Sequence, residues 1–159
     1  MAKHHHRVLA VAARSGRLGA VVLDSGRLVF WTTSRKASLS SAAAAAKLRD
    51  WLAEFQPDVL VTENPDTAGR KKGRQIAILR AFLEVGQDAK LVNLAVRRVR
   101  RFENAYAEAA SFVARFPDLQ QLRPEKPPIW GKEPYTLVCF DALVLIREAG
   151  LLGPATEPV

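Results

Sequence analysis

An aspartate inside an apolar run is the first residue of this sequence that could do chemistry. Asp141 lies in residues 137–146 (LVCFDALVLI), and at helical spacing it shares a face with apolar side chains. A buried carboxylate without a partner costs several kcal/mol, so Asp141 requires a cation, a metal ion or hydrogen-bond donors close by. It is therefore either a hydrogen-bonded structural aspartate or a metal ligand.

A second acid, Glu63, follows the apolar residues 59–61 and ends a predicted strand. Acids at strand ends are commonly solvated, so Glu63 alone indicates little. Together with Asp141 it supplies two carboxylates from separate elements. Phosphodiesterases hold Mg²⁺ or Mn²⁺ with such oxygen ligands, and the metal activates water to attack the phosphate.

Positive charge is concentrated in one part of the chain. Residues 70–101 contain ten lysines or arginines and two acids, an excess that equals the net charge of +8 of the whole protein. Clustered cations favour nucleic acid, because binding a polyphosphate releases its counterions. The alternative is a solvated basic surface with no partner. The predicted phosphate contacts are Arg70, Lys71, Lys72, Arg74, Arg97, Arg98, Arg100 and Arg101.

The N-terminal half predicts the elements that position Glu63. Apolar stretches separated by turn sequences predict two consecutive hairpins. Their strands cover residues 8–12, 18–23 and 28–31. Ser40 and Ser41 suit the start of a helix that ends near Phe55, before Pro57. The strand that Glu63 ends comes next.

The C-terminal half predicts the elements that position Asp141. A helix over residues 70–84 ends at Gly86, and a strand covers 90–96. The basic residues 97–101 then begin an irregular or helical segment. Further helices are expected at 104–115 and 135–149, with a proline-rich loop at 123–134.

In this predicted order the hairpins come first and the helical crossover connections follow. Such an order predicts an α/β fold, with a mixed β-sheet covered by helices. The length suits a single domain over residues 7–150, and residues 1–6 and 151–159 are expected to be flexible termini. No apolar run is long enough for a membrane span, so we expect a cytoplasmic protein. Cys139, the only cysteine, is expected to be a buried thiol.

This order of elements resembles RuvC-type Holliday junction resolvases of the RNase H-like superfamily. The likeness runs over residues 8–149 and includes RFPDL at 115–119 and FDAL at 140–143. It implies an RNase H-like sheet of three antiparallel N-terminal strands plus parallel strands. It also implies a metal-dependent endonuclease that acts on branched DNA in recombination, commonly as a homodimer.

The sequence departs from this family at two acids. The family has an aspartate at the end of the first strand, where this chain has Ala12, and another acid three residues before Asp141, where it has Val138. Glu63 and Asp141 match the remaining two acids. Glu133 is a surrogate for a missing ligand, or simply an acid favourable near a helix N-terminus. Asp24 and Asp66 are weaker surrogates.

Three functions follow. The first is a nucleic-acid-binding protein for branched or structured DNA whose phosphodiesterase activity is weak or lost because of Ala12. The second is an active structure-selective endonuclease that uses Glu63, Asp141 and Glu133 with Mg²⁺ or Mn²⁺. The third is a non-catalytic module of a recombination or transcription complex. Tyr135 and Trp130 also flank the proline-rich loop, where they would stack on an unpaired base or seal the core.

Overall fold

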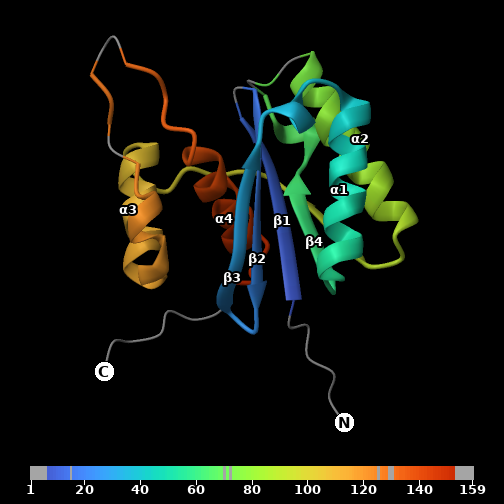
Figure 1. The fold of residues 1–159 in the computed structure, drawn as a ribbon, viewed down its shortest axis with the longest axis horizontal. Coiled ribbons are helices and arrows are strands. Elements are labelled where there is room, and N and C mark those ends of the chain that lie inside the picture. Colours follow the sequence, from blue (N-terminus) through green and yellow to red (C-terminus); the bar gives the residue numbers. More distant parts are fainter. Residues whose placement is uncertain are drawn as a thin grey trace.

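The sheet in the computed structural model has its strands in the order β3-β2-β1-β4-β5 (Figure 1). The structure describes residues 7–14, 16–69, 71, 73–124, 126–128 and 131–152. Strands β1 (Arg7–Arg14), β2 (Arg17–Asp24) and β3 (Arg27–Ser34) form two consecutive antiparallel hairpins, as predicted. Gly16 and Gly26 lie in the turns with φ of 78° and 81°, where a side chain would be strained.

The remaining strands run parallel to β1. Strand β4 (Val59–Glu63) pairs with β1, and β5 (Val92–Val96) pairs with β4. Parallel neighbours need crossovers, which are supplied by α1 (Ser41–Phe55) and α2 (Arg74–Asp88). The predicted mixed sheet is therefore confirmed, and the C-terminal ends of β1, β4 and β5 lie at one edge of it.

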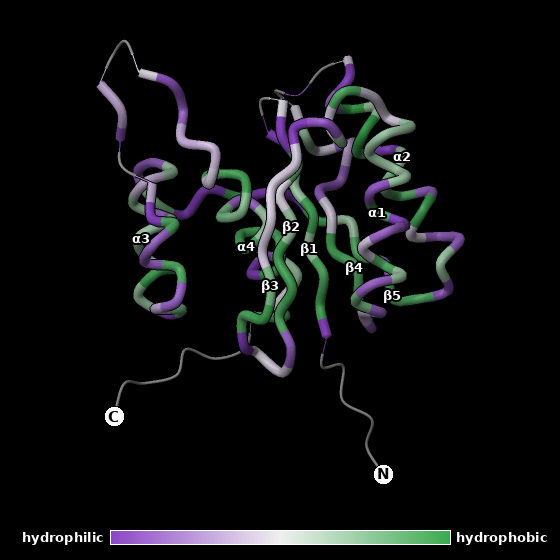
Figure 2. Tube along the Cα trace, in the orientation of Figure 1, coloured by the Kyte–Doolittle hydropathy of each residue, from purple (hydrophilic) through white to green (hydrophobic). Residues whose placement is uncertain are grey.

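Helices cover both faces of the sheet. Helices α1 and α2 pack on one face, and α3 (Ala105–Arg115) and α4 (Leu137–Glu148) pack on the other (Figure 1). Strand β1 is hydrophobic along most of its length, whereas α1 and α3 alternate between hydrophobic and hydrophilic residues (Figure 2). Accordingly, Leu9 and Val11 enter the core beneath α1 and α2, while Ala10 and Ala12 enter the core beneath α3 and α4.

Helix α1 begins and ends where the sequence predicts. The Ser40 hydroxyl accepts a hydrogen bond from the backbone N–H of Ala43 at 3.0 Å, which satisfies a free donor of the first turn. At the other end Gln56 has a φ of 46°, and Pro57 follows. The chain is thus directed straight into β4, which carries Glu63.

Helix α2 differs from its prediction at both ends. It begins at Arg74 rather than at residue 70, and it continues through Gly86 to Asp88. Gly86 is buried, and a β-carbon there would overlap the side chain of Asn93 on β5. The glycine therefore permits close packing of α2 on the sheet instead of ending the helix.

Helix α4 is enclosed on all sides, since every residue from 137 to 146 is buried. A β-carbon at Gly19 of β2 would come within 2.7 Å of Val138, so the glycine lets the helix lie directly on the sheet. Burial raises the pKa of the Cys139 thiol to about 12, and the thiol donates to the backbone oxygen of Thr32 at 3.6 Å. The predicted buried thiol is confirmed.

The ends of the chain are partly described. Leu151 and Leu152, which the sequence analysis assigned to the C-terminal tail, pack against the core beneath α4. Residues 1–6 and 153–159, also expected to be flexible, lie outside the described residues. Within the described ranges, no helix has the length and apolar character needed to cross a membrane.

Candidate nucleic-acid interface

Side chains from β1, from the segment after β5 and from α4 meet at the edge where the parallel strands end. Ala12 faces α4, so Arg14, two residues later on β1, faces the same way. Val61 also faces α4, and the same alternation directs Glu63 to that side. The two acids that sequence analysis predicted, Glu63 and Asp141, therefore lie on the same face of the sheet.

Asp141 is paired with two arginines. Its side chain lies on α4 and the residue is only 6% exposed. Arg14 Nη1 lies 3.0 Å from Oδ2 and 3.2 Å from Oδ1, and Arg98 Nη1 lies 2.7 Å from Oδ1. Of the expected partners of this carboxylate, a cation, a metal ion or hydrogen-bond donors, the structure supplies two guanidinium groups, one from β1 and one from the segment after β5.

Glu133 reaches the same arginine from the loop before α4. Its carboxylate oxygens lie 2.9 Å from Arg14 Nε and 3.2 Å from Arg14 Nη2. Burial opposes the charge of Arg14, but the charge of Asp141 and the hydrogen bonds that Arg14 donates to Glu133 and Asp141 outweigh it and raise the pKa of the guanidinium. Glu133 is therefore brought beside Asp141, although through a shared arginine.

Glu63 has a different kind of partner. It is 6% exposed at the C-terminal end of β4, and Oε1 lies 2.6 Å from Lys71 Nζ. Lys71 comes from the loop that connects β4 to α2. A residue predicted to contact phosphate is therefore paired with a residue predicted to bind metal.

The two positions where the family has acids are apolar and buried. Ala12 pairs with Gly19 across the β1–β2 hairpin, and Val138 covers that glycine. Among the described residues, no group of three histidines, cysteines or acids lies close enough to hold a metal ion. A divalent cation would also meet Arg14, Arg98 and Lys71, which repel it. The arrangement does not fit a two-metal centre.

The basic segment after β5 is fixed to α4 at several points. Besides the bond between Arg98 and Asp141, Arg101 Nε lies 2.8 Å from Oε2 of Glu148, and Arg147 donates to the backbone oxygen of Val99 at 3.0 Å. The hydrogen bond between Arg101 and Glu148 raises the pKa of the arginine and lowers that of the glutamate. The segment is irregular, as one of the two predicted alternatives allowed.

The eight predicted phosphate contacts therefore fall into three groups. Lys71, Arg98 and Arg101 are paired with carboxylates. Arg74, Arg97 and Arg100 are exposed and make no ion pair with any described residue. Arg70 and Lys72 lie outside the described residues. Of the predicted stacking residues, Tyr135 is 51% exposed and Trp130 is not described.

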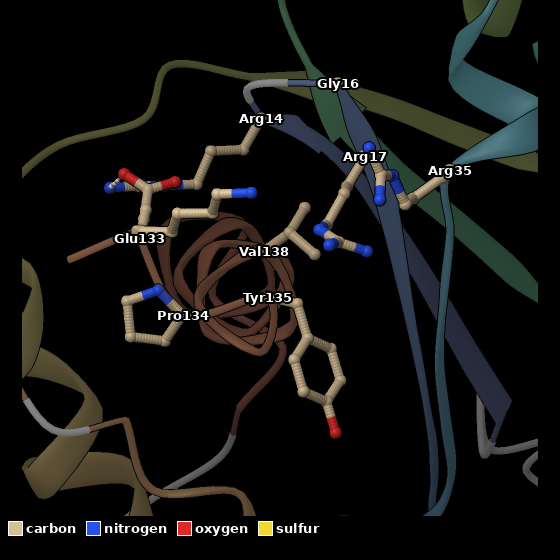
Figure 3. A pocket seen from close by; sticks show the side chains of 9 residues that line it. Arg14, Gly16, Arg17, Arg35, Glu133, Pro134, Tyr135 and Val138 are labelled. Carbon is tan, nitrogen blue, oxygen red and sulfur yellow. Dashed lines mark hydrogen bonds and ion pairs between the residues drawn. The ribbon is translucent and has the colours of Figure 1, made fainter. Parts of the chain in front are cut away.

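A surface hollow of about 240 Å³ opens beside Arg14. Figure 3 shows Arg17 and Arg35 converging on it from the strand side, with Tyr135 and Glu133 at the end of α4. Lys132 also lines it. The sequence analysis missed Arg14, Arg17, Arg35 and Lys132. Strand alternation from Ala12 would have identified Arg14, but the other three come together only in the folded chain.

Solved structures match this fold, whereas no family model and no curated protein matches the sequence. RuvC of T. thermophilus in complex with a Holliday junction substrate is 16% identical with a TM-score of 0.56, over 92% of this chain and 98% of that chain. A second Thermus thermophilus RuvC structure is 14% identical with a TM-score of 0.53, over 94% and 98%. Fowlpox virus resolvase, in complex with substrate Holliday junction DNA, is 11% identical with a TM-score of 0.59, over 92% and 99%. The chain thus has the RNase H-like α/β fold of these resolvases.

Proposed function

We propose that this protein binds branched DNA and that its ability to cleave it is lost or much reduced. The fold likeness to two resolvases solved with Holliday junctions supports the DNA partner. The charge distribution agrees, because Arg74, Arg97 and Arg100 are exposed cations without a carboxylate partner among the described residues. Such cations contact phosphates, which position a duplex without reading its sequence.

The pairing of Asp141 with Arg14 and Arg98 is the observation that carries the loss of cleavage. In a metal-dependent site the carboxylate oxygens must be free to bind the metal. Here each oxygen of Asp141 accepts a guanidinium hydrogen bond of 3.0 Å or less. Ala12 adds no ligand, since a methyl group cannot bind a metal.

The carboxylates instead order the basic surface. Asp141 holds Arg98, and Glu148 holds Arg101, so the segment between them is fixed at both ends. Arg97, just before the first anchor, and Arg100, between the two anchors, are left exposed. On this proposal Asp141 is a positioning residue for phosphate contacts rather than a metal ligand.

The test compares binding with cleavage on four-way junctions and flap substrates. We expect binding that weakens steeply with salt, and little or no cleavage by the wild type with Mg²⁺ or Mn²⁺. Any residual cleavage should be unchanged in Glu63→Gln and should fall in Asp141→Asn only as far as junction binding falls, with both variants checked for folding by circular dichroism. A rise in cleavage on Ala12→Asp would assign the loss to that position. Strong wild-type cleavage abolished by either acid variant would make the proposal wrong.

An active endonuclease is the second candidate, because one arginine brings Glu133 and Asp141 together. A ligand set of Glu63, Asp141 and Glu133 would require Arg14 to move away when a metal binds. Metal-dependent cleavage that is lost in Glu133→Gln would favour this candidate.

If the protein binds no junction at any salt concentration, the non-catalytic assembly module becomes the better hypothesis. A homodimer would suit a two-fold junction, and light scattering tests it.

A further inference from the structure

We infer that the hollow beside Arg14 binds one unpaired nucleotide of a DNA strand. Its phosphate would contact Arg17, Arg35 and Lys132, and its base would lie against Tyr135. The inference rests on the proposed function, and it names the feature of branched DNA that this end of the molecule recognises. None of these four residues belongs to the predicted set of phosphate contacts.

The charges in the hollow are unbalanced. Its acid, Glu133, is paired with Arg14, so these two cancel. Arg17, Arg35 and Lys132 remain, and none of them pairs with a carboxylate of a described residue. Three cations that share a concave surface repel one another, and an anion relieves that repulsion. A phosphate is the anion that DNA supplies.

The end of α4 adds to this field. The helix has 12 residues and begins at the hollow, where Pro134 and Tyr135 form part of the wall (Figure 3). Its first turn has no acidic residue, and Thr136 makes no side-chain cap. The N–H groups of Leu137 and Cys139 donate to backbone oxygens, so the helix N-terminus contributes its partial positive charge to the hollow rather than free hydrogen-bond donors.

An aromatic surface lies next to the cations. Tyr135 is 51% exposed, and the guanidinium carbon of Arg17 is 5.6 Å from the centre of its ring. A phosphate on Arg17 would thus have its own base within reach of the ring. Stacking on tyrosine tolerates every base, but it requires a base that is not stacked in a duplex.

The size of the hollow limits its ligand to a single nucleotide. A volume of about 240 Å³ is below the roughly 300 Å³ at which sites for drug-sized ligands begin, so a duplex cannot enter. A second hollow shares Arg14, Gly16 and Arg17 with the first and extends to Arg74 at the start of α2. The rest of the strand would therefore continue along exposed cations of the predicted interface.

The experiment compares a fully paired four-way junction with one that carries a short unpaired flap. Fluorescence anisotropy should show about tenfold tighter binding of the flapped junction by the wild type. Tyr135→Leu should remove this preference and Tyr135→Phe should keep it. Arg35→Gln and Lys132→Gln should each weaken binding of the flapped junction by several-fold. Arg27→Gln is the charge control, because Arg27 is exposed at the start of β3, at the opposite end of the sheet.

Photochemical cross-linking locates the unpaired nucleotide on the protein. Iodouridine at the unpaired position should cross-link to the peptide that contains Tyr135. Equal affinity for both junctions, or a cross-link only to α2, would overturn the inference and leave the proposed function intact. Failure to bind either junction would instead contradict the proposed function. Deoxyadenosine monophosphate is added as a competitor of the flapped junction. If it displaces the flapped junction when present at the same concentration as that junction, the hollow is a site for a free nucleotide and the assignment to a DNA strand is overturned.

Discussion

Asp141 and Glu63 are both buried acids at the same edge of the sheet, but they are neutralised in different ways. Asp141 lies between Arg14, which is 127 residues away in the sequence, and Arg98, which is 43 residues away. Glu63 is paired with Lys71, eight residues later in the adjoining loop. One acid joins three distant parts of the fold, and the other fixes a single local connection.

The difference teaches how much each acid matters to the fold. Arg14 and Arg98 are mostly buried, so without Asp141 their charges would face each other at close range. The Lys71 side chain is only 16% exposed, but it is a flexible lysine on a loop and no second cation of a described residue faces it across Glu63, so without Glu63 its ammonium group can turn toward water. We therefore expect Asp141 to be needed for stability and Glu63 to be tolerant of substitution.

The largest expected effect is that of Asp141→Asn. Removing one partner of a buried ion pair leaves uncompensated charge, and we expect the free energy of unfolding in urea to fall by about 3 kcal/mol. Glu133→Gln is the control, since it also removes an acid from Arg14 but its side chain is 41% exposed. That variant should lose less than about 1 kcal/mol. Equal losses in the two variants would mean that burial does not raise the cost of removing Asp141.

A smaller loss is expected for Glu63→Gln, about 1 kcal/mol, because the lysine can regain water. The double variant with Lys71→Gln should lose little more than the single one, which a double-mutant cycle measures directly. A loss as large as that of Asp141→Asn would mean that the β4–α2 loop holds Lys71 rigidly. The comparison between the two acids would then fail.

Much of this arrangement could be predicted from the sequence. Apolar runs separated by turn glycines predicted the hairpins, and the apolar surroundings of Asp141 predicted that a cation, a metal ion or hydrogen-bond donors lie nearby. The identity of that cation could not be predicted, because local patterns carry no information on which side chain 127 residues away will meet Asp141. The end of α2 was mispredicted for the same kind of reason. The need for glycine at position 86 comes from its contact with Asn93 on another element, which local sequence patterns do not show.

Substitution of Arg100 should weaken junction binding without lowering the stability of the fold. This arginine is exposed and has no ion pair with any described residue, so Arg100→Gln should leave the free energy of unfolding within about 0.5 kcal/mol of the wild type. Loss of one phosphate contact should lower junction affinity several-fold and reduce the logarithmic salt slope by about 1. Arg49→Gln on the exposed side of α1 removes the same charge elsewhere and should leave both binding measurements unchanged.

The smallest effect concerns pH and the other end of α4. Hydrogen bonds from Arg101 and Arg147 lower the pKa of Glu148 below its ordinary value of 4.5. The unfolded chain therefore binds a proton at a higher pH than the folded chain does. The contribution of Glu148 to stability is complete above pH 4.5 and is lost as the pH falls through the lower, folded pKa. Urea unfolding between pH 6 and about pH 3 should thus show a shallower decline for Glu148→Gln than for the wild type. Parallel declines would mean that Arg101 and Arg147 do not hold this carboxylate, and that the segment of residues 97–101 is fixed by Asp141 and by the bond from Arg147 to Val99.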